Sequence, residues 1–275
     1  MMCLRNGGLY ILAARPGVGK TSFALKLAQN VAGGEEPAGV FFFSLEVDAT
    51  DLMKKILSGL ADVDFRKIET GQLDEAEFAS VNEAATQIKD WRFDLMDISD
   101  LNINRLRSIL RRRKVECPER MNLIIVDYLQ LLQGSRKDMN EYEKVSEISR
   151  TLKVAARELE VPIVALSQMS RDVEKSAQEK PREPKLSDLR GSGSIEQDAD
   201  AVMFLHRVDP EQSLERDVKL VIAKNRFGPM GHADLIFYPA RQNFVEKGAG
   251  MAVYSEPLDV GSNSGEDGDD EDLFA

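Results

Sequence analysis

Short apolar segments alternate with longer amphipathic segments along the first 250 residues of the chain. The short segments are almost continuously apolar, which is typical of strands that are buried on both faces of a parallel sheet. We therefore predict strands at residues 9–13, 40–44, 93–97, 123–127, 162–167, 201–205, 218–223 and 233–237.

The longer segments have the period of helices with one buried face. Apolar residues recur in them at every third or fourth position, as in the sets Ala24, Ala28 and Val31, and Val145, Ile148, Leu152, Ala156 and Leu159. This spacing places the apolar side chains on one side of each helix, where they join the core. The alternation predicts an α/β fold with a mostly parallel central sheet flanked by helices.

Two stretches interrupt this alternation. Residues 171–190 are rich in charge and contain Pro181 and Pro184, and residues 261–275 are rich in Gly, Ser and acidic residues. Such compositions are typical of mobile segments. A chain of 275 residues supports one core, so we predict one domain at residues 1–250 and an acidic, disordered tail at residues 251–275.

The net charge of −11 is concentrated in that tail. From Glu256 onward there are eight acidic residues and no basic ones, which leaves a net charge of −3 on the rest of the chain. A nearly neutral body can present a basic channel, so the overall charge does not exclude a nucleic-acid partner.

The two cysteines, Cys3 and Cys117, have no spacing partner for a metal site, and secreted disulfide frameworks use more cysteines. No apolar run approaches the roughly 18 residues that span a bilayer, and residues 1–8 lack a signal-peptide pattern. We therefore expect a soluble, cytoplasmic protein with no membrane partner.

A glycine-rich turn follows the first predicted strand and precedes a helix. Residues 14–21 read Ala-Arg-Pro-Gly-Val-Gly-Lys-Thr, a P-loop (Walker A motif) with Ala14 where the usual pattern has glycine. The backbone N–H groups of such a loop surround phosphates, and the helix N-terminus adds a partial positive charge. Lys20 is expected to reach the β- and γ-phosphates of ATP, and Thr21 to hold Mg²⁺.

We predict that the whole loop binds the nucleotide, through Arg15, Pro16, Gly17, Val18, Gly19, Lys20, Thr21 and Ser22. The alternative is a glycine-rich turn that matches the motif by chance.

Three further polar residues follow predicted strands. Glu46 follows residues 40–44, Asp127 ends residues 123–127, and Gln168 follows residues 162–167. Ligands of an open α/β sheet bind at the carboxyl ends of its strands, so these side chains are expected beside the phosphate loop. We predict that Asp127 orients Mg²⁺ or its waters and that Glu46 polarises the attacking water. The alternative is that either acid caps the following helix.

Gln168 is predicted to sense the γ-phosphate and to pass its state to the loop that follows it. As a single amide, it is the weakest of these signals.

These motifs and their order resemble the C-terminal, RecA-like ATPase domain of the DnaB-type replicative DNA helicases, from about residue 7 to residue 246. The similarity is carried by residues 13–21, 44–46, 127–131, 165–171, 187–200 and 224–229. The run Ser-Asp-Leu-Arg-Gly-Ser-Gly-Ser-Ile-Glu-Gln-Asp-Ala-Asp at 187–200 separates this family from RecA and KaiC relatives, which share only the phosphate-binding motifs.

The resemblance implies an ATP-dependent helicase that moves along single-stranded DNA as a homo-hexamer, with a primase or a helicase loader as possible partners. For Lys20, Thr21, Glu46, Asp127 and Gln168 it implies the same roles as those predicted above. It also implies that Arg190, Gly191 and Gly193 contact the DNA backbone, although Gly191 stands where the family has an acidic residue. Glycines allow close approach to phosphates and Arg190 supplies charge; the alternative is two ordinary turn glycines.

Lys224 and Arg226 form a Lys-x-Arg pattern at the end of a predicted strand. By resemblance, this pair reaches the ATP of the neighbouring subunit, with Arg226 as an arginine finger. The alternative is a solvated strand end.

The sequence starts a few residues before its first predicted strand, where the family carries an N-terminal helical domain and a linker helix that grips the next subunit. This start leaves ring assembly by the chain open, and we expect one subunit to rescue the activity of another only at high protein concentration or with DNA present. Two other functions compete with the helicase: a RecA- or RadA-like recombination filament, and a KaiC-like regulatory ATPase that DNA does not stimulate.

Overall fold

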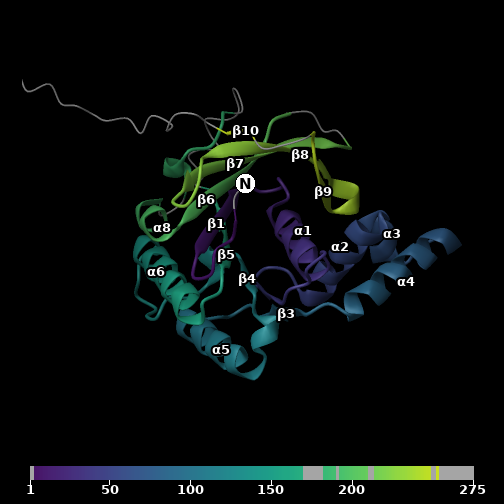
Figure 1. Ribbon diagram of the computed structural model, residues 1–275. Coiled ribbons are helices and arrows are strands. Elements are labelled where there is room, and N and C mark those ends of the chain that lie inside the picture. Colours follow the sequence, from purple (N-terminus) through teal and green to yellow (C-terminus); the bar gives the residue numbers. More distant parts are fainter. Residues whose placement is uncertain (1–2, 170–181, 190–191, 210–213, 249–251, 254–275) are drawn as a thin grey trace, which may run out of the picture.

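A computed structural model describes residues 3–169, 182–189, 192–209, 214–248 and 252–253. Its centre is a ten-stranded sheet with the order β10-β8-β7-β6-β1-β5-β4-β2-β3, in which β9 also pairs with β8 (Figure 1). The strands are β1 (Leu9–Ala14), β2 (Val40–Ser44), β3 (Phe93–Asp97), β4 (Leu123–Asp127), β5 (Ile163–Gln168), β6 (Ala201–Arg207), β7 (Arg216–Asn225), β8 (Gly231–Tyr238), β9 (Asn243–Glu246) and β10 (Ala252–Val253).

Strands β1 to β6 pair in parallel, and β7 to β10 add antiparallel strands beyond β6. The mostly parallel sheet predicted from the sequence is therefore confirmed. The helices are α1 (Lys20–Ala32), α2 (Ala49–Ala61), α3 (Phe65–Thr70), α4 (Glu75–Lys89), α5 (Ile103–Glu116), α6 (Glu141–Leu159) and α8 (Ser192–Asp198), with short 3₁₀ turns η1 (Pro118–Arg120), η2 (Leu129–Leu131), η3 (Leu186–Asp188) and η4 (Pro239–Arg241).

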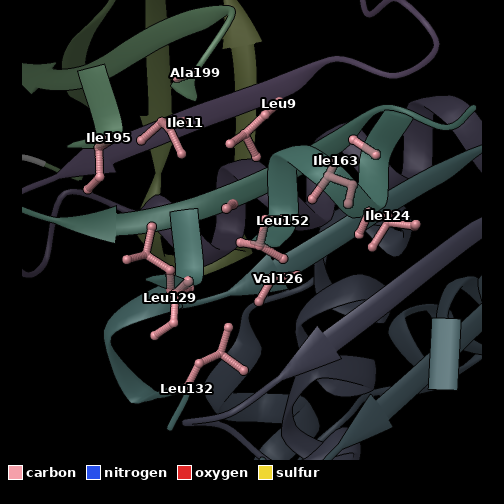
Figure 2. Close-up of a cluster of buried hydrophobic side chains, with 14 of the residues drawn as sticks. Leu9, Ile11, Ile124, Val126, Leu129, Leu132, Leu152, Ile163, Ile195 and Ala199 are labelled. Carbon is pink, nitrogen blue, oxygen red and sulfur yellow. The ribbon is translucent and has the colours of Figure 1, made fainter. Parts of the chain in front are cut away.

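The sheet separates two apolar clusters, and alternate residues of each central strand join opposite clusters. Leu9 and Ile11 of β1 pack with side chains of α5, α6 and α8, and Figure 2 shows part of this cluster around Leu152 of α6. Tyr10 and Leu12 point to the other face and pack with side chains of α1 and α2. Helices therefore cover both faces, as Figure 1 also shows.

All eight predicted strands are present, with ends that differ by up to two residues. The predicted stripe of α6 is buried throughout, whereas Val31 of α1 is only half-buried. The prediction missed β9 and β10, which have only four and two residues. Segments this short carry too little of a periodic pattern to be recognised.

The expectation that every strand is buried on both faces is wrong for β3 and β8. No residue of β3 is fully buried, because β3 lies at the edge of the sheet and pairs only with β2. In β8, buried and half-buried positions are mixed, because this strand belongs to the antiparallel part of the sheet. Antiparallel strands commonly leave one face near solvent.

Most of the two stretches predicted to be mobile lies outside the described residues, and so does the tail from residue 254 onward. Within the first stretch, residues 182–189 contain η3 and a two-bond ion pair between Arg182 and Asp188, at 2.8 and 2.7 Å. None of the helices in the described part of the chain is both long and apolar enough to cross a membrane.

Asp200 forms hydrogen bonds with three parts of the fold near the start of β1. Its buried Oδ2 accepts hydrogen bonds from the backbone N–H of Leu9 (2.8 Å) and from Lys153 Nζ of α6 (2.5 Å). Its backbone pairs with Leu9 and with Arg226 at the end of β7. The carboxylate therefore joins β1, α6 and the segment after β7.

We expect Asp200→Ala to lower the free energy of unfolding by about 3 to 5 kcal/mol, because Lys153 would lose the partner of a largely buried ion pair. Denaturant unfolding followed by circular dichroism measures this change. Asp198→Ala is the matched control, since Asp198 ends α8 only half-buried, and its effect should stay within about 0.5 kcal/mol. Equal effects of the two substitutions would contradict the role assigned to Asp200.

Candidate active site

A cavity of about 400 Å³ lies at the carboxyl ends of β1 and β5, over the N-terminus of α1. Seven of the eight predicted nucleotide-binding residues line it, together with Ala14. The exception is Val18, whose side chain is buried in the core between α1 and the sheet. The predicted phosphate loop thus lines a hollow above the N-terminus of α1.

The loop depends on two glycines in left-handed conformations, Gly17 with φ 76° and Gly19 with φ 100°. At Gly19 a Cβ atom would lie 2.9 Å from the ring of Phe237, so both the backbone and the packing favour glycine. Gly19 precedes α1, and within the described chain no side chain caps this helix. Its first N–H groups therefore stay available for an anionic ligand.

Residues that are distant in the sequence form hydrogen bonds with the phosphate loop. Arg216 of β7 donates a hydrogen bond to the Gly17 carbonyl (3.0 Å). The Ser22 hydroxyl donates to Gln242 Oε1 (2.8 Å). The antiparallel part of the sheet therefore forms one wall of the cavity.

Thr21 lines the cavity and contacts Asp127, which is not itself among the lining residues. The Thr21 hydroxyl donates to Asp127 Oδ2 at 2.7 Å, and Asp127 is only 1% exposed. Burial raises the pKa of Asp127, while the charge of Lys20 and the Thr21 hydrogen bond oppose this shift. The second carboxylate oxygen, Oδ1, is buried without a hydrogen-bond partner among the described residues.

This pair fits a magnesium ion that is shared with phosphates. A hydroxyl and a carboxylate are the hard oxygen ligands that Mg²⁺ prefers, and the unpartnered Oδ1 is a buried acceptor beside them. In the described segments no group of three or more His, Cys, Asp or Glu residues could hold a metal by itself. A bound ion would therefore need ligands from a nucleotide and from water, which is how Mg²⁺ usually binds.

Lys20 lies against the ring of Tyr128, with its Nζ 4.3 Å from the ring centroid. Burial lowers the pKa of Lys20, and the carboxylates of Asp127 and Glu46 partly oppose this shift. The ring stabilises the cation by a cation–π contact where water is scarce. A polyphosphate entering the cavity would favour the charged form further.

Glu46 and Gln168 line the same cavity, as predicted. Glu46 is exposed, and it does not cap α2, because the cap is Asp48, whose side chain accepts the N–H of Asp51 at 2.9 Å. Asp127 is not a cap either, since the cap of the following turn η2 is Tyr128. The alternative reading of both acids as helix caps is therefore wrong.

Lys224 and Arg226 do not line this cavity. The Lys224 ammonium donates to the carbonyls of Glu196 and Ala199 (2.9 Å to Ala199), and Arg226 donates to the carbonyl of Gln197 (2.6 Å). Both side chains thus hold the C-terminal end of α8, where cations are favourable. They are not a freely solvated strand end.

The predicted DNA-contacting residues Arg190 and Gly191 lie outside the described residues. Gly193 is exposed in α8, and a Cβ atom there would approach only the Tyr142 hydroxyl, at 3.8 Å. Packing therefore does not require glycine at position 193.

The sequence analysis missed several residues that line the cavity: Lys55, Tyr128, Arg216, Phe237, Pro239 and Gln242. Tyr128 adjoins Asp127, so its place could have been inferred from that neighbour. Lys55 lies on α2, nine residues after Glu46, and its charge slightly opposes the rise that burial causes in the pKa of Asp127. The other four come from the antiparallel strands and the turn that follows β8, whose position over the loop no local pattern encodes.

Comparison with known proteins agrees with this geometry. A family model described as "DnaB-like helicase C terminal domain" matches residues 1–246. The replicative DNA helicase DnaC of Bacillus subtilis is 42% identical over 245 residues, which cover 88% of this chain and 53% of that protein. The replicative DNA helicase DnaB of Geobacillus stearothermophilus has the same identity and coverage.

Two solved structures are similar in both fold and sequence. The first, an isolated ATPase domain, has a TM-score of 0.80 at 34% identity, over 89% of this chain and 86% of that domain. The second, a DnaB-like replicative helicase described with its interactions with primase, has the same TM-score and identity over 88% of this chain and 58% of its own. The chain thus spans about half the length of the curated relatives it matches.

We expect Lys20→Ala to weaken ATP binding about 100-fold, equivalent to ~2.7 kcal/mol, because the ammonium faces the cavity and would pair with phosphate. The melting temperature should not fall, since the substitution removes a buried charge. Lys54→Ala is the control, because Lys54 pairs with Asp51 (3.0 Å) and does not line the cavity. Titration with a fluorescent ATP analogue gives both affinities, and wild-type affinity in Lys20→Ala would remove the phosphate-site assignment.

Proposed function

The chain belongs to the family of DnaB-like helicase C-terminal domains, and from this we propose that it is the ATP-hydrolysing motor of a replicative DNA helicase. In this proposal, ATP hydrolysis drives translocation on single-stranded DNA and unwinding of the duplex. The observation that carries it is the Thr21–Asp127 contact beside Lys20, in a cavity that Glu46 and Gln168 also line.

The loop at residues 15–22 binds the phosphates through its backbone N–H groups and the N-terminus of α1. Lys20 leaves the face of Tyr128 to pair with the β- and γ-phosphates. Thr21 and Asp127 would hold Mg²⁺, which would supply positive charge beside the phosphates.

Glu46 accepts hydrogen bonds from the attacking water and polarises it, since it is the exposed carboxylate of the cavity. Lys55 adds a second ammonium to this side of the cavity, where it balances the charge of the two acids. The two acids have different roles because they differ in burial. Asp127 is buried and would bind the ion, whereas Glu46 is exposed and can reach the attacking water.

Gln168 lies where nucleotide state can reach the DNA-binding loop. The next residue, Met169, forms an isolated antiparallel bridge with Leu189, and its N–H donates to the Ala14 carbonyl (3.4 Å). Leu189 directly precedes Arg190. We propose that a change at Gln168 shifts this bridge and so moves Arg190, Gly191 and Gly193 on the DNA backbone.

Lys224 and Arg226 act on ATP bound by a neighbouring subunit, in a homo-hexamer. Neither residue lines the chain's own cavity, which supports action in trans. A primase or a helicase loader is a partner of such a ring, as one similar helicase is described with primase. A replicative helicase of this kind works on DNA in the cytoplasm.

The proposal predicts ATPase activity that rises when single-stranded DNA is added. Glu46→Gln should still bind ATP, because the loop is intact, while turnover falls by about 10² to 10⁴ as general base function is lost. Steady-state hydrolysis with and without DNA, run beside native mass spectrometry, measures both. DNA-independent hydrolysis would favour a regulatory ATPase instead, and near-normal turnover of Glu46→Gln would remove its assigned role.

If Arg226 is an arginine finger, two inactive variants should regain ATPase activity when they are mixed. Arg226→Ala should lose about 10³ to 10⁵ in rate with little change in ATP affinity. Mixing it with Lys20→Ala creates interfaces where an intact loop faces an intact Arg226, so ATPase activity should return in part. Arg112→Ala, which alters an exposed pair with Glu116, is the control and should be active alone. Normal hydrolysis by Arg226→Ala in a proven ring would contradict the finger.

A further inference from the structure

The pairing between β4 and β5 stops before the cavity. Their parallel register runs only from Ile124 and Ile163 to Val126 and Ala165. Strand β5 continues to Gln168, and on its other side it stays paired with β1 up to Ala14. On the side of β4, no strand of the described chain accompanies the last residues of β5.

The side chain of Gln130 occupies that position. Its Oε1 accepts the backbone N–H of Gln168 (3.3 Å), and its Nε2 approaches the Gln168 carbonyl (3.4 Å). Nε2 also donates to the Ser167 hydroxyl at 2.8 Å. The amide therefore contacts both backbone groups of Gln168, as a neighbouring strand would.

Gln130 is itself firmly placed. It is 8% exposed in η2, between the fully buried Leu129 and the cavity edge of β5. The Lys144 ammonium of α6 donates to its backbone carbonyl at 2.9 Å. It lies three positions after Asp127 in the sequence, so it links the end of β4 to the end of β5.

We infer that Gln130 is a positioning residue, which holds Gln168 at the edge of the cavity in register with Asp127. The inference rests on the proposed function of Gln168 as a sensor of the γ-phosphate. The Gln130 side chain contacts Gln168 and Ser167 and is not among the residues that line the cavity, so we assign it a positioning role. Its loss frees Gln168 and slows turnover while ATP binding is kept.

The chemistry of the side chain makes this role specific. A primary amide carries a donor and an acceptor on one group, so it matches the N–H and C=O of a peptide. Methionine has a similar length and volume but offers neither a strong donor nor a strong acceptor. Gln130→Met therefore removes the contacts to Gln168 and keeps the packing.

The test is a double-mutant cycle with Gln130→Met, Gln168→Ala and the combined variant. The measurements are kcat and KM of ATP hydrolysis with single-stranded DNA, and the melting temperature. Gln133→Met is the matched control, since Gln133 is exposed and contacts only Asp100 and the backbone of the neighbouring loop in the described structure. Gln130→Met should lower kcat about tenfold, with KM within about twofold of the wild type, and Gln133→Met should not change kcat.

In the Gln168→Ala background, Gln130→Met should have no further effect on kcat, because the residue it positions is gone. Effects that multiply, or a wild-type kcat in Gln130→Met, would overturn the inference while leaving Gln168 as a sensor. A wild-type kcat in Gln168→Ala would instead overturn the sensor role and the inference with it.

Ser167→Ala keeps the test decisive if Gln130→Met does not fold. This change removes the acceptor of the 2.8 Å contact but leaves Gln130 in place. It should lower kcat less than Gln130→Met is expected to, in the same direction, and again without effect in the Gln168→Ala background. An unchanged kcat in a folded Ser167→Ala protein would overturn the inference.

Discussion

The hydrogen bond between Thr21 and Asp127 is the contact around which the site is arranged. Its two residues lie 106 positions apart in the sequence: Thr21 is in the first turn of α1, after β1, and Asp127 ends β4, with β5 between these two strands. The contact forms only when β1, β5 and β4 end at the same edge. The same order places Gln168 between the phosphate loop and Asp127, so the sheet topology assembles the cavity.

The cavity contains charged groups whose burial is unfavourable. Burial lowers the pKa of Lys20 and raises that of Asp127, which shows that each charge is costly where it stands. Gly17 and Gly19 hold left-handed conformations, and one oxygen of Asp127 has no partner among the described residues. A phosphate with its cation would offset these unfavourable charges and supply the missing partner of Asp127.

Side chains at the two ends of β7 hold different parts of the molecule. Lys224 near the end of β7 and Arg226 just after it donate to carbonyls at the end of α8, while Arg216 at the start of β7 donates to the phosphate loop. One strand therefore connects the chain's own nucleotide site to the residues proposed to act on a neighbour's. Helix α8 starts beside the proposed DNA loop, so the same residues are linked to the DNA contact.

The sequence by itself determined the fold class, the eight principal strands, and the placement of Lys20, Thr21, Glu46 and Gln168 around one cavity, with Asp127 in contact with Thr21. It could do so because periodicity and strand ends are local properties, and parallel strands bring their carboxyl ends to one edge. Only the tertiary structure decided which neighbours complete the site. The wall formed by Arg216, Phe237 and Gln242 and the bridge made by Gln130 depend on packing between segments far apart in the chain, and no local pattern specifies such contacts.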